Sequence, residues 1–195
     1  MSQIIGLTGG IASGKSAVTA YLREQGYVVI DADEVVHELQ AKGGRLYQVL
    51  VDWLGQDILK ADGELNRPVL AEIIFANPDN RAKSAELQNG IIREELAKRR
   101  DEVAQTERLF FMDIPLLYEL QFDGWFDAVW LVYVDRKTQL ERLMARNGYT
   151  ALEAQQRLAS QLSLDEKKEM ADLVIDNNGY LEETYAQLEA ALKEW

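Results

Sequence analysis

The sequence contains no cysteine, one histidine and no long apolar run. The absence of cysteine excludes disulfide bridges and thiolate metal sites, and it suits a protein of the reducing cytoplasm. A single histidine, His37, cannot form a histidine-based zinc site. The apolar run AVWLVYV is far shorter than the roughly 18 residues that a membrane-spanning helix needs. No basic residue precedes Lys15, so the N-terminus does not resemble a signal peptide. We therefore expect a cytoplasmic protein without a membrane segment.

Positive charge is also scarce. The 195 residues carry a formal net charge of −12 at pH 7. An acidic surface repels polyanions, which argues against nucleic acid or an anionic membrane as a partner. Any phosphate group must therefore be bound by a local arrangement of donors. Basic residues are concentrated between 136 and 168, where seven Lys or Arg stand against four Asp or Glu.

Short apolar runs alternate with amphipathic segments, which is typical of a parallel sheet covered by helices. The predicted strands span 4–8, 27–31, 109–113, 128–134 and 173–176. The second and third strands are separated by far more chain than one crossover helix needs, and the intervening sequence has helical patterns. We predict a core of residues 1–33, 106–135 and 169–195, a helical insertion at 34–105 and a helical lid at 136–168. Predicted helix caps are Asn66, Thr150 with Glu153, and Ser163 with Glu166.

The stretch GGIASGKS lies between the first predicted strand and a predicted helix. Gly9, Gly14, Lys15 and Ser16 match the pattern G-x-x-x-x-G-K-[ST] in the strand-to-helix context that this motif requires. Glycines let the backbone curl so that its N–H groups can cradle phosphates, and the helix N-terminus adds partial positive charge. In such loops the lysine reaches the β- and γ-phosphates, and the serine hydroxyl binds Mg²⁺. We predict a nucleotide site in an α/β fold of the P-loop NTPase type, with a five-stranded parallel sheet and helices on both faces.

Carboxylates follow two of the predicted strands. Ligands of open α/β sheets lie outside the carboxyl ends of the strands, so Asp33 and Asp113 are candidates for the site. Asp33 suits a base near an attacking hydroxyl, and Asp113 suits the magnesium shell together with Ser16. The alternatives are structural: Asp33 as the N-cap of a helix near Glu34, and Asp113 as a cap or turn residue before Pro115.

Arginines of the predicted lid could neutralise the charge that develops during phosphoryl transfer. Arg142 and Arg146 are one helical turn apart, and Arg157 belongs to the next predicted helix. Solvated helix charge is the alternative for each of them. No Asn is followed by Lys, so the guanine motif of a switch GTPase is absent.

Several motifs together resemble the dephospho-CoA kinase family. They are IIGLTGGIASGKSAV, VIDADEVVHEL, LNRPVLAEIIF, DIPLLYEL, DAVWLVYVDRKTQLERLMAR and AQQRLASQLSLDEKKEMADLVIDNNG. The order and spacing of these motifs agree with the family over nearly the whole chain. The resemblance implies ATP-dependent phosphorylation of the ribose 3′-hydroxyl of dephospho-CoA, giving CoA and ADP, with Mg²⁺ bridging the ATP phosphates. It implies a helical CoA-binding domain and a lid, in agreement with the two insertions.

The resemblance also implies roles for individual residues. Asp33 would be the general base, with Lys15, Arg142 and Arg146 as further catalytic residues. The predicted ATP-binding residues are Gly9, Gly10, Ala12, Ser13, Gly14, Lys15, Ser16, Ala17, Arg157 and Asn177, the last beside the adenine. The predicted acceptor-binding residues are Asp33, Asn66, Arg67, Pro115 and Leu116, and the predicted metal ligands are Ser16 and Asp113. For His37 we expect a surface or capping role.

This chain departs from the family pattern at three places. The family usually has Gly at position 12 and Thr at position 17, where this chain has Ala12 and Ala17. Both residues are small, so we expect phosphate binding to survive. The family usually has His-Pro where this chain has Asn89-Gly90, which bears on the acceptor pocket.

Two other functions are compatible with the residues. The first is a kinase for another nucleoside-like or small hydroxyl acceptor, because the P-loop and a base do not specify the acceptor. The second is a nucleotide-dependent interaction module, against which the candidate base and lid argue. The sequence predicts no oligomeric state.

Overall fold

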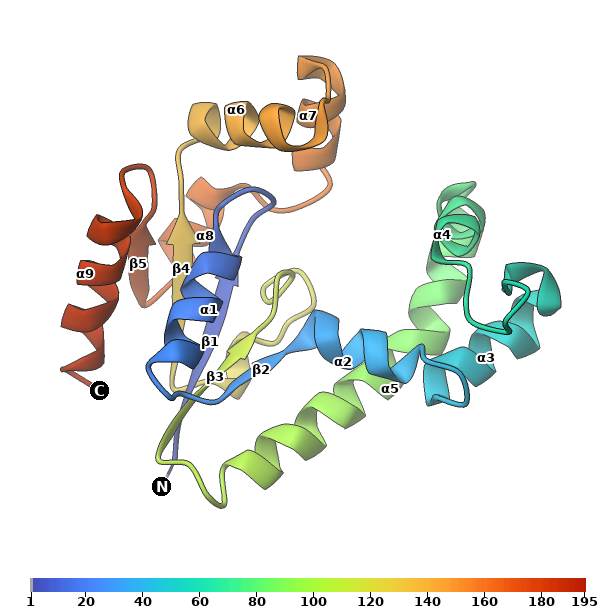
Figure 1. The fold of residues 1–195 in the computed structure, drawn as a ribbon, viewed down its shortest axis with the longest axis horizontal. Coiled ribbons are helices and arrows are strands. Elements are labelled where there is room, and N and C mark those ends of the chain that lie inside the picture. Colours follow the sequence, from blue (N-terminus) through green and yellow to red (C-terminus); the bar gives the residue numbers. More distant parts are fainter. Residues whose placement is uncertain (1) are drawn as a thin grey trace. The chain divides into compact units, whose positions relative to one another are not determined.

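The computed structural model describes residues 2–195 (Figure 1). They form two compact units, one of residues 2–30 and 103–195 and the other of Asp31–Glu102. The first unit includes the predicted lid segment, and the second corresponds to the predicted insertion with a boundary a few residues earlier. Asp33, which the sequence boundary assigned to the core, therefore belongs to the second unit.

A parallel sheet forms the centre of the first unit. Its strands are β1 (Gln3–Gly9), β2 (Val29–Asp31), β3 (Leu109–Asp113), β4 (Ala128–Tyr133) and β5 (Leu173–Asp176), in the order β2-β3-β1-β4-β5. The central strand β1 pairs in parallel with β3 and β4, and Leu7 lies opposite both Asp113 and Trp130. The predicted five-stranded sheet is confirmed, although β2 begins at Val29 and not at Tyr27. The carboxyl end of β1 leads directly into the glycine-rich loop.

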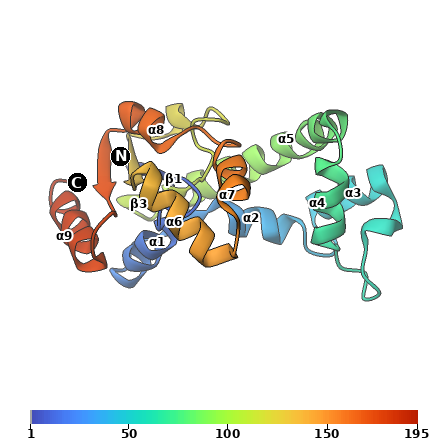
Figure 2. The ribbon, with the colours of Figure 1, turned by 90° about the horizontal axis from the view of Figure 1, so that it is seen from above.

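Helices cover both faces of this sheet (Figures 1 and 2). They are α1 (Lys15–Glu24), α6 (Arg136–Asn147), α7 (Ala151–Leu158), α8 (Leu164–Met170) and α9 (Leu181–Leu192). Successive side chains of a strand point to opposite faces. Trp130 and Val132 of β4 therefore share a core with Leu22 of α1 and Leu188 of α9, whereas Leu131 packs with α8.

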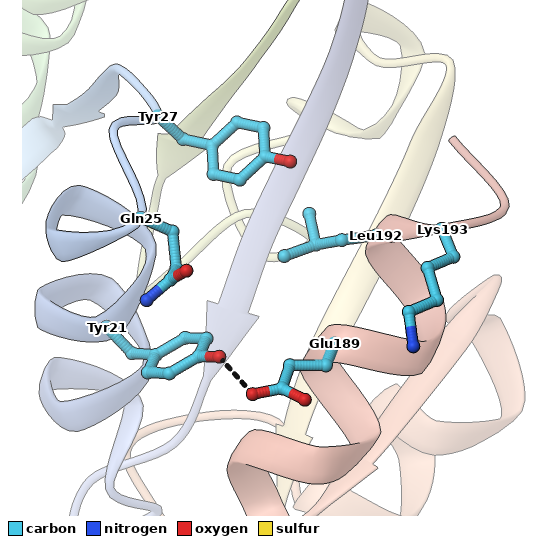
Figure 3. A pocket seen from close by; sticks show the side chains of 6 residues that line it. All are labelled: Tyr21, Gln25, Tyr27, Glu189, Leu192 and Lys193. Atoms are coloured by element: carbon cyan, nitrogen blue, oxygen red, sulfur yellow. Dashed lines mark hydrogen bonds between the residues drawn. The ribbon is translucent and has the colours of Figure 1, made fainter.

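Tyr21 joins α1 to α9, and its hydrogen bond to Glu189 is drawn in Figure 3. Tyr21 stacks on Tyr185 with ring centroids 4.4 Å apart, and its hydroxyl donates to a Glu189 carboxylate oxygen at 2.9 Å. Burial, followed by this carboxylate, raises the pKa of Tyr21. These contacts fix α9 against α1 beside a pocket of about 330 Å³ that Lys193 also lines.

The second unit is helical, as its sequence patterns predict. Its helices are α2 (Ala32–Leu39), α3 (Arg45–Leu54), α4 (Arg67–Phe75) and α5 (Pro78–Val103), the last of which extends one residue into the first unit. Leu50, Ile58, Leu65 and Leu70 form its buried core. Asn66 caps α4, because its side chain accepts a hydrogen bond from the Val69 N–H at 3.5 Å.

None of the helices in residues 2–195 has both the length and the apolar character needed to cross a bilayer.

Candidate active site

The glycine-rich loop ends at the N-terminus of α1. Gly14 immediately precedes this helix and has a φ of 86°, and no side chain caps the helix. The first N–H groups of α1 can therefore bind an anion. Gly14 is required on two grounds: its φ lies in the left-handed region, and a Cβ there would collide with Nδ2 of Asn177.

Asn177 supports the glycine-rich loop through hydrogen bonds. Its side chain is 3% exposed. Its Nδ2 donates to the Ser13 carbonyl at 2.8 Å, and its Oδ1 accepts from the Thr184 hydroxyl at 2.8 Å. Both ends of the amide are thus engaged by protein groups, one in the loop and one in α9. The structure gives Asn177 a part in supporting the loop, and its contact with adenine stays a prediction.

The tip of the loop is bound by the lid segment. The Ile11 carbonyl accepts from Gln139 Nε2 of α6 at 2.8 Å, and the Ile11 N–H donates to Gln161 Oε1 at 3.2 Å. Ile11 and Ala12 also pack against the apolar cluster of α6 and α7, which contains Leu143. The loop conformation is therefore coupled to the lid by polar and apolar contacts.

The remaining loop residues are closely packed. A Cβ at Gly9 would lie 2.5 Å from Ser13 Oγ, and one at Gly10 would lie 2.8 Å from Gln139 Nε2. The Ser13 hydroxyl is buried without a hydrogen-bond partner among residues 2–195. Ser16 and Ala17 belong to the first turn of α1, where the Ser16 side chain is exposed. This packing explains why the loop needs glycine at its first two positions.

Lys15 and Asp113 form the charged centre of the first unit. Asp113 is 1% exposed, and one of its carboxylate oxygens binds the Lys15 ammonium. The other accepts from the Thr19 hydroxyl at 2.6 Å. A buried carboxylate needs such partners, because desolvation of an unpaired charge is costly. Asp113 thus lies beside the P-loop lysine. This is the position that a role near the phosphates would require.

The three lid arginines have different surroundings. A Cβ at Gly14 would lie 3.9 Å from Nη1 of Arg142, so this guanidinium lies beside the loop. Arg146 donates through Nε to Asn147 Oδ1 at 2.9 Å. The Arg157 guanidinium lies 5.8 Å from the centroid of the Tyr149 ring. The structure brings Arg142 to the P-loop, whereas the roles of Arg146 and Arg157 in ATP binding stay predictions.

In the second unit, Asp33 lies on the first turn of α2. The cap of this helix is Asp31, whose side chain accepts from the N–H groups of Asp33 at 2.8 Å and Glu34 at 3.2 Å. The alternative interpretation of Asp33 as the N-cap is therefore wrong. The Asp33 side chain is exposed and lines a cavity of about 440 Å³ together with Glu34, His37 and Glu38. An exposed carboxylate at the edge of a cavity can act as a base.

Arg67 is connected to the same cavity through His37. Its Nη1 lies 3.0 Å from His37 Nε2, and its Nε donates to Gln40 Oε1 at 3.4 Å. The sequence suggested only a surface or capping role for His37, and the structure shows an exposed ring that joins the cavity to Arg67. Neighbouring Asn66 uses its side chain as the cap of α4.

Pro115 and Leu116 follow β3 in the first unit. The Pro115 carbonyl accepts from the Thr8 hydroxyl at 3.2 Å and from Lys167 Nζ at 3.0 Å. The structure thus connects this segment to β1 and α8 through hydrogen bonds. Its contact with an acceptor stays a prediction.

Sequence reasoning missed the polar side chains that support the loop. They are Glu119, Gln139, Gln161, Lys167 and Thr184. One signal was present for Lys167, because it follows Leu164 at helical spacing and the two are the buried residues of α8. For the others the sequence offers no signal, since glutamate, glutamine and threonine are usual on protein surfaces.

Comparison with known proteins supplies the decisive observation. A sequence model described as dephospho-CoA kinase matches residues 3–183. The chain belongs to the dephospho-CoA kinase family. The dephospho-CoA kinase of Streptococcus mutans serotype c is 61% identical over 193 residues, which cover 99% of this chain and 98% of the relative. That of Streptococcus agalactiae serotype Ia is 64% identical over 181 residues, 93% of either chain.

Solved structures agree with this membership of the dephospho-CoA kinase family. A Thermus thermophilus protein is 30% identical, with a TM-score of 0.83 over 99% of this chain and 97% of its own. The dephospho-CoA kinase of Campylobacter jejuni, 23% identical, has the same fold with a TM-score of 0.77 over 100% of this chain and 97% of its own. The predicted family, the α/β P-loop fold and the class of ATP-dependent kinase are confirmed.

Proposed function

We propose that this protein transfers the γ-phosphoryl group of ATP to the ribose 3′-hydroxyl of dephospho-CoA, giving CoA and ADP in the cytoplasm. The observation that carries the proposal is the uncapped P-loop helix with Lys15 beside Asp113, in a chain that matches dephospho-CoA kinases over nearly its whole length. In this proposal the α1 N–H groups and Lys15 bind the phosphates of ATP. Arg142 neutralises the transferring group, while the lid excludes water.

Ser16 and Asp113 are the residues that would hold Mg²⁺. A hydroxyl and a carboxylate are hard oxygen donors, and Mg²⁺ typically takes one or two protein ligands beside phosphates and waters. Both residues adjoin Lys15, one by sequence and the other by its ion pair. When bound, the ion supplies charge neutralisation at the β- and γ-phosphates.

On the acceptor side, Asp33 takes the proton of the attacking hydroxyl. Its support is the exposed Asp33 carboxylate at the edge of the 440 Å³ cavity, on the first turn of a helix that Asp31 caps. Arg67, joined to this cavity through His37, is suited to pair with a phosphate of dephospho-CoA. Asn66, Pro115 and Leu116 stay proposed contacts of the acceptor.

The deciding experiment measures ADP release from Mg-ATP with dephospho-CoA, with adenosine, with nucleoside monophosphates and without acceptor. We expect rapid release only with dephospho-CoA, accompanied by an equal amount of CoA. Faster release with another acceptor would assign a different substrate. Nucleotide binding without any acceptor-dependent release would favour an interaction module.

The proposed base is tested with Asp33→Asn and, as a matched control, Glu34→Gln on the same turn and cavity wall. We expect Asp33→Asn to lower kcat by about 10²- to 10⁴-fold, the usual contribution of a general base, with little change in Mg-ATP affinity. Glu34→Gln should keep most of its activity. Equal losses of ATP affinity and turnover in Asp33→Asn would show a structural role.

A further inference from the structure

Lys167 is a fully buried cation behind the P-loop. It lies in α8 with 0% exposure. Its Nζ lies 3.2 Å from the Gly9 carbonyl, 3.0 Å from the Pro115 carbonyl and 3.0 Å from Glu119 Oε1. An ammonium has three N–H donors, and three acceptors surround this one. The geometry is therefore that of a saturated buried donor.

Burial of this charge is costly. Desolvation has the largest effect on the Lys167 ammonium and lowers its pKa. The carboxylate of Glu119 raises this pKa, and the nearby charge of Lys15 lowers it further. If this lysine served only to fill space, an apolar residue in its place would make the fold more stable. The contacts of the ammonium therefore call for an explanation beyond packing.

The three acceptors belong to the glycine-rich loop and to the chain that follows β3. Gly9 begins the glycine-rich loop, and Pro115 follows the strand that ends at Asp113. Glu119 accepts, through Oε1, from the Leu162 N–H at 3.1 Å, in the segment that joins α7 to α8 near the end of the lid. Lys167 thus connects the loop, the segment after β3 and the end of the lid.

The bond to Gly9 has a direct geometric effect on the loop. In a planar trans peptide the C=O and the following N–H point in opposite directions. Holding the Gly9 carbonyl on Lys167 therefore directs the Gly10 N–H away from Lys167. Backbone N–H groups of this loop type are the donors that cradle phosphate.

We propose that Lys167 is a positioning residue for ATP, which orients the Gly9–Gly10 peptide of the P-loop and, through Glu119, couples it to the end of the lid. The proposal rests on the proposed kinase function only for its link to turnover, because nucleotide binding can be measured without an acceptor. Lys167 itself acts through the loop backbone.

The test compares Lys167→Met with Lys168→Met, which removes the same charge from the neighbouring exposed position of α8. Mg-ATP affinity is measured by titration calorimetry without acceptor, and thermal unfolding monitors the fold. We expect Lys167→Met to weaken Mg-ATP binding by about tenfold or more, a loss typical of a displaced positioning element. The KM for dephospho-CoA should change less than the affinity for ATP, and Lys168→Met should resemble the wild type.

Two further variants separate positioning from a charge left unpaired. Lys167→Met leaves Glu119 without its cation, whereas Lys167→Met with Glu119→Gln removes both charges. We expect the double variant to keep the weakened ATP binding, because the Gly9 carbonyl still lacks its donor. If Lys167→Met does not fold, the single variant Glu119→Gln is measured in its place. We expect it to lose ATP affinity, but less than is expected for Lys167→Met.

Three outcomes would overturn the proposal. They are equal ATP affinities of Lys167→Met and Lys168→Met, recovery of ATP binding in the double variant, and, where Lys167→Met does not fold, wild-type ATP affinity of Glu119→Gln. A wild type that binds Mg-ATP but does not phosphorylate dephospho-CoA would contradict the proposed function and leave this comparison intact.

Discussion

Ala12 adopts a backbone conformation that side chains disfavour. Its φ is 60°, and the conformation is left-handed for an L residue that carries a Cβ. Such a conformation costs roughly 1–2 kcal/mol outside glycine. The contacts of its methyl group with the lid cluster offset part of this cost. The departure from the glycine usual in the family is therefore tolerated at a local energetic penalty.

We predict that Ala12→Gly raises the free energy of unfolding by about 0.5 kcal/mol, because relief of the strained φ exceeds the loss of the methyl contacts. Ala17→Gly is the matched control, since Ala17 lies in the helical backbone of α1. There the same change should lower stability by about 1 kcal/mol. Urea denaturation measures both variants, and similar losses in the two would contradict the strain at Ala12.

At the scale of elements, α6 brings one arginine to the nucleotide loop. Arg142 and Arg146 are one helical turn apart and so lie on the same side of α6. Their described contacts differ, because Arg142 lies beside Gly14 whereas Arg146 bonds to Asn147. We predict that Arg142→Ala lowers kcat/KM for ATP by about tenfold or more beyond the loss in Arg146→Ala, because it removes charge stabilisation at the phosphates. Steady-state kinetics with varied ATP measure both variants. A larger loss in Arg146→Ala would reverse the assignment.

Helix α5 contains the departure Asn89-Gly90 in its interior. Gly90 is exposed, and a Cβ placed on it would meet no atom within 4 Å. We predict that Gly90→Ala raises the free energy of unfolding by about 0.5–1 kcal/mol, because glycine is a poor helix former. Urea denaturation measures the change, and the KM for dephospho-CoA shows whether the methyl group enters the acceptor site. A loss of stability would indicate a role for glycine other than helix formation.

Elements could be predicted well where the signal is local. Both capping boxes, Thr150 with Glu153 and Ser163 with Glu166, form as their spacing predicts. The bounds of β3 and β5 also agree, because each strand is a short continuous apolar run that ends at an aspartate.

The supports of the site could not be predicted in the same way. The bond from Gln139 to the Ile11 carbonyl joins residues 128 positions apart, and that from Asn177 to Ser13 joins residues 164 apart. A periodic pattern shows which face of a helix is buried, but not which backbone group that face will meet. The same reason explains why the loop motif was recognisable while its partners were not.

At the scale of the whole molecule, two tyrosines make the free energy of unfolding depend on pH in the alkaline range. The hydrogen bond to Asp165, followed by burial, raises the pKa of Tyr133 to about 12, and burial, followed by the charge of Asp172, raises that of Tyr118 to about 12. In the unfolded chain both hydroxyls ionise near 10.0. Between these values the folded state binds more protons than the unfolded state, so stability falls as pH rises.

We therefore predict a decreasing free energy of unfolding from about pH 10 to about pH 12, with a shallower slope in Tyr133→Phe. Tyr180→Phe serves as the control, because the Tyr180 side chain is 78% exposed. Urea denaturation at several alkaline pH values measures the slope. Identical slopes for the wild type and Tyr133→Phe would exclude Tyr133 as a contributor.

The packing of Trp195 against the sheet has an optical consequence. Its ring lies 6.3 Å from that of buried Trp130, at an interplanar angle of 72°. Two indoles held this close and inclined should couple their electronic transitions and give a circular dichroism signal in the ultraviolet. Trp195 follows α9, and the same helix carries Thr184, which holds Asn177 under the P-loop. Loosening of α9 would therefore weaken this signal and the support of the P-loop together, so the protein carries an intrinsic, label-free spectroscopic reporter of its P-loop.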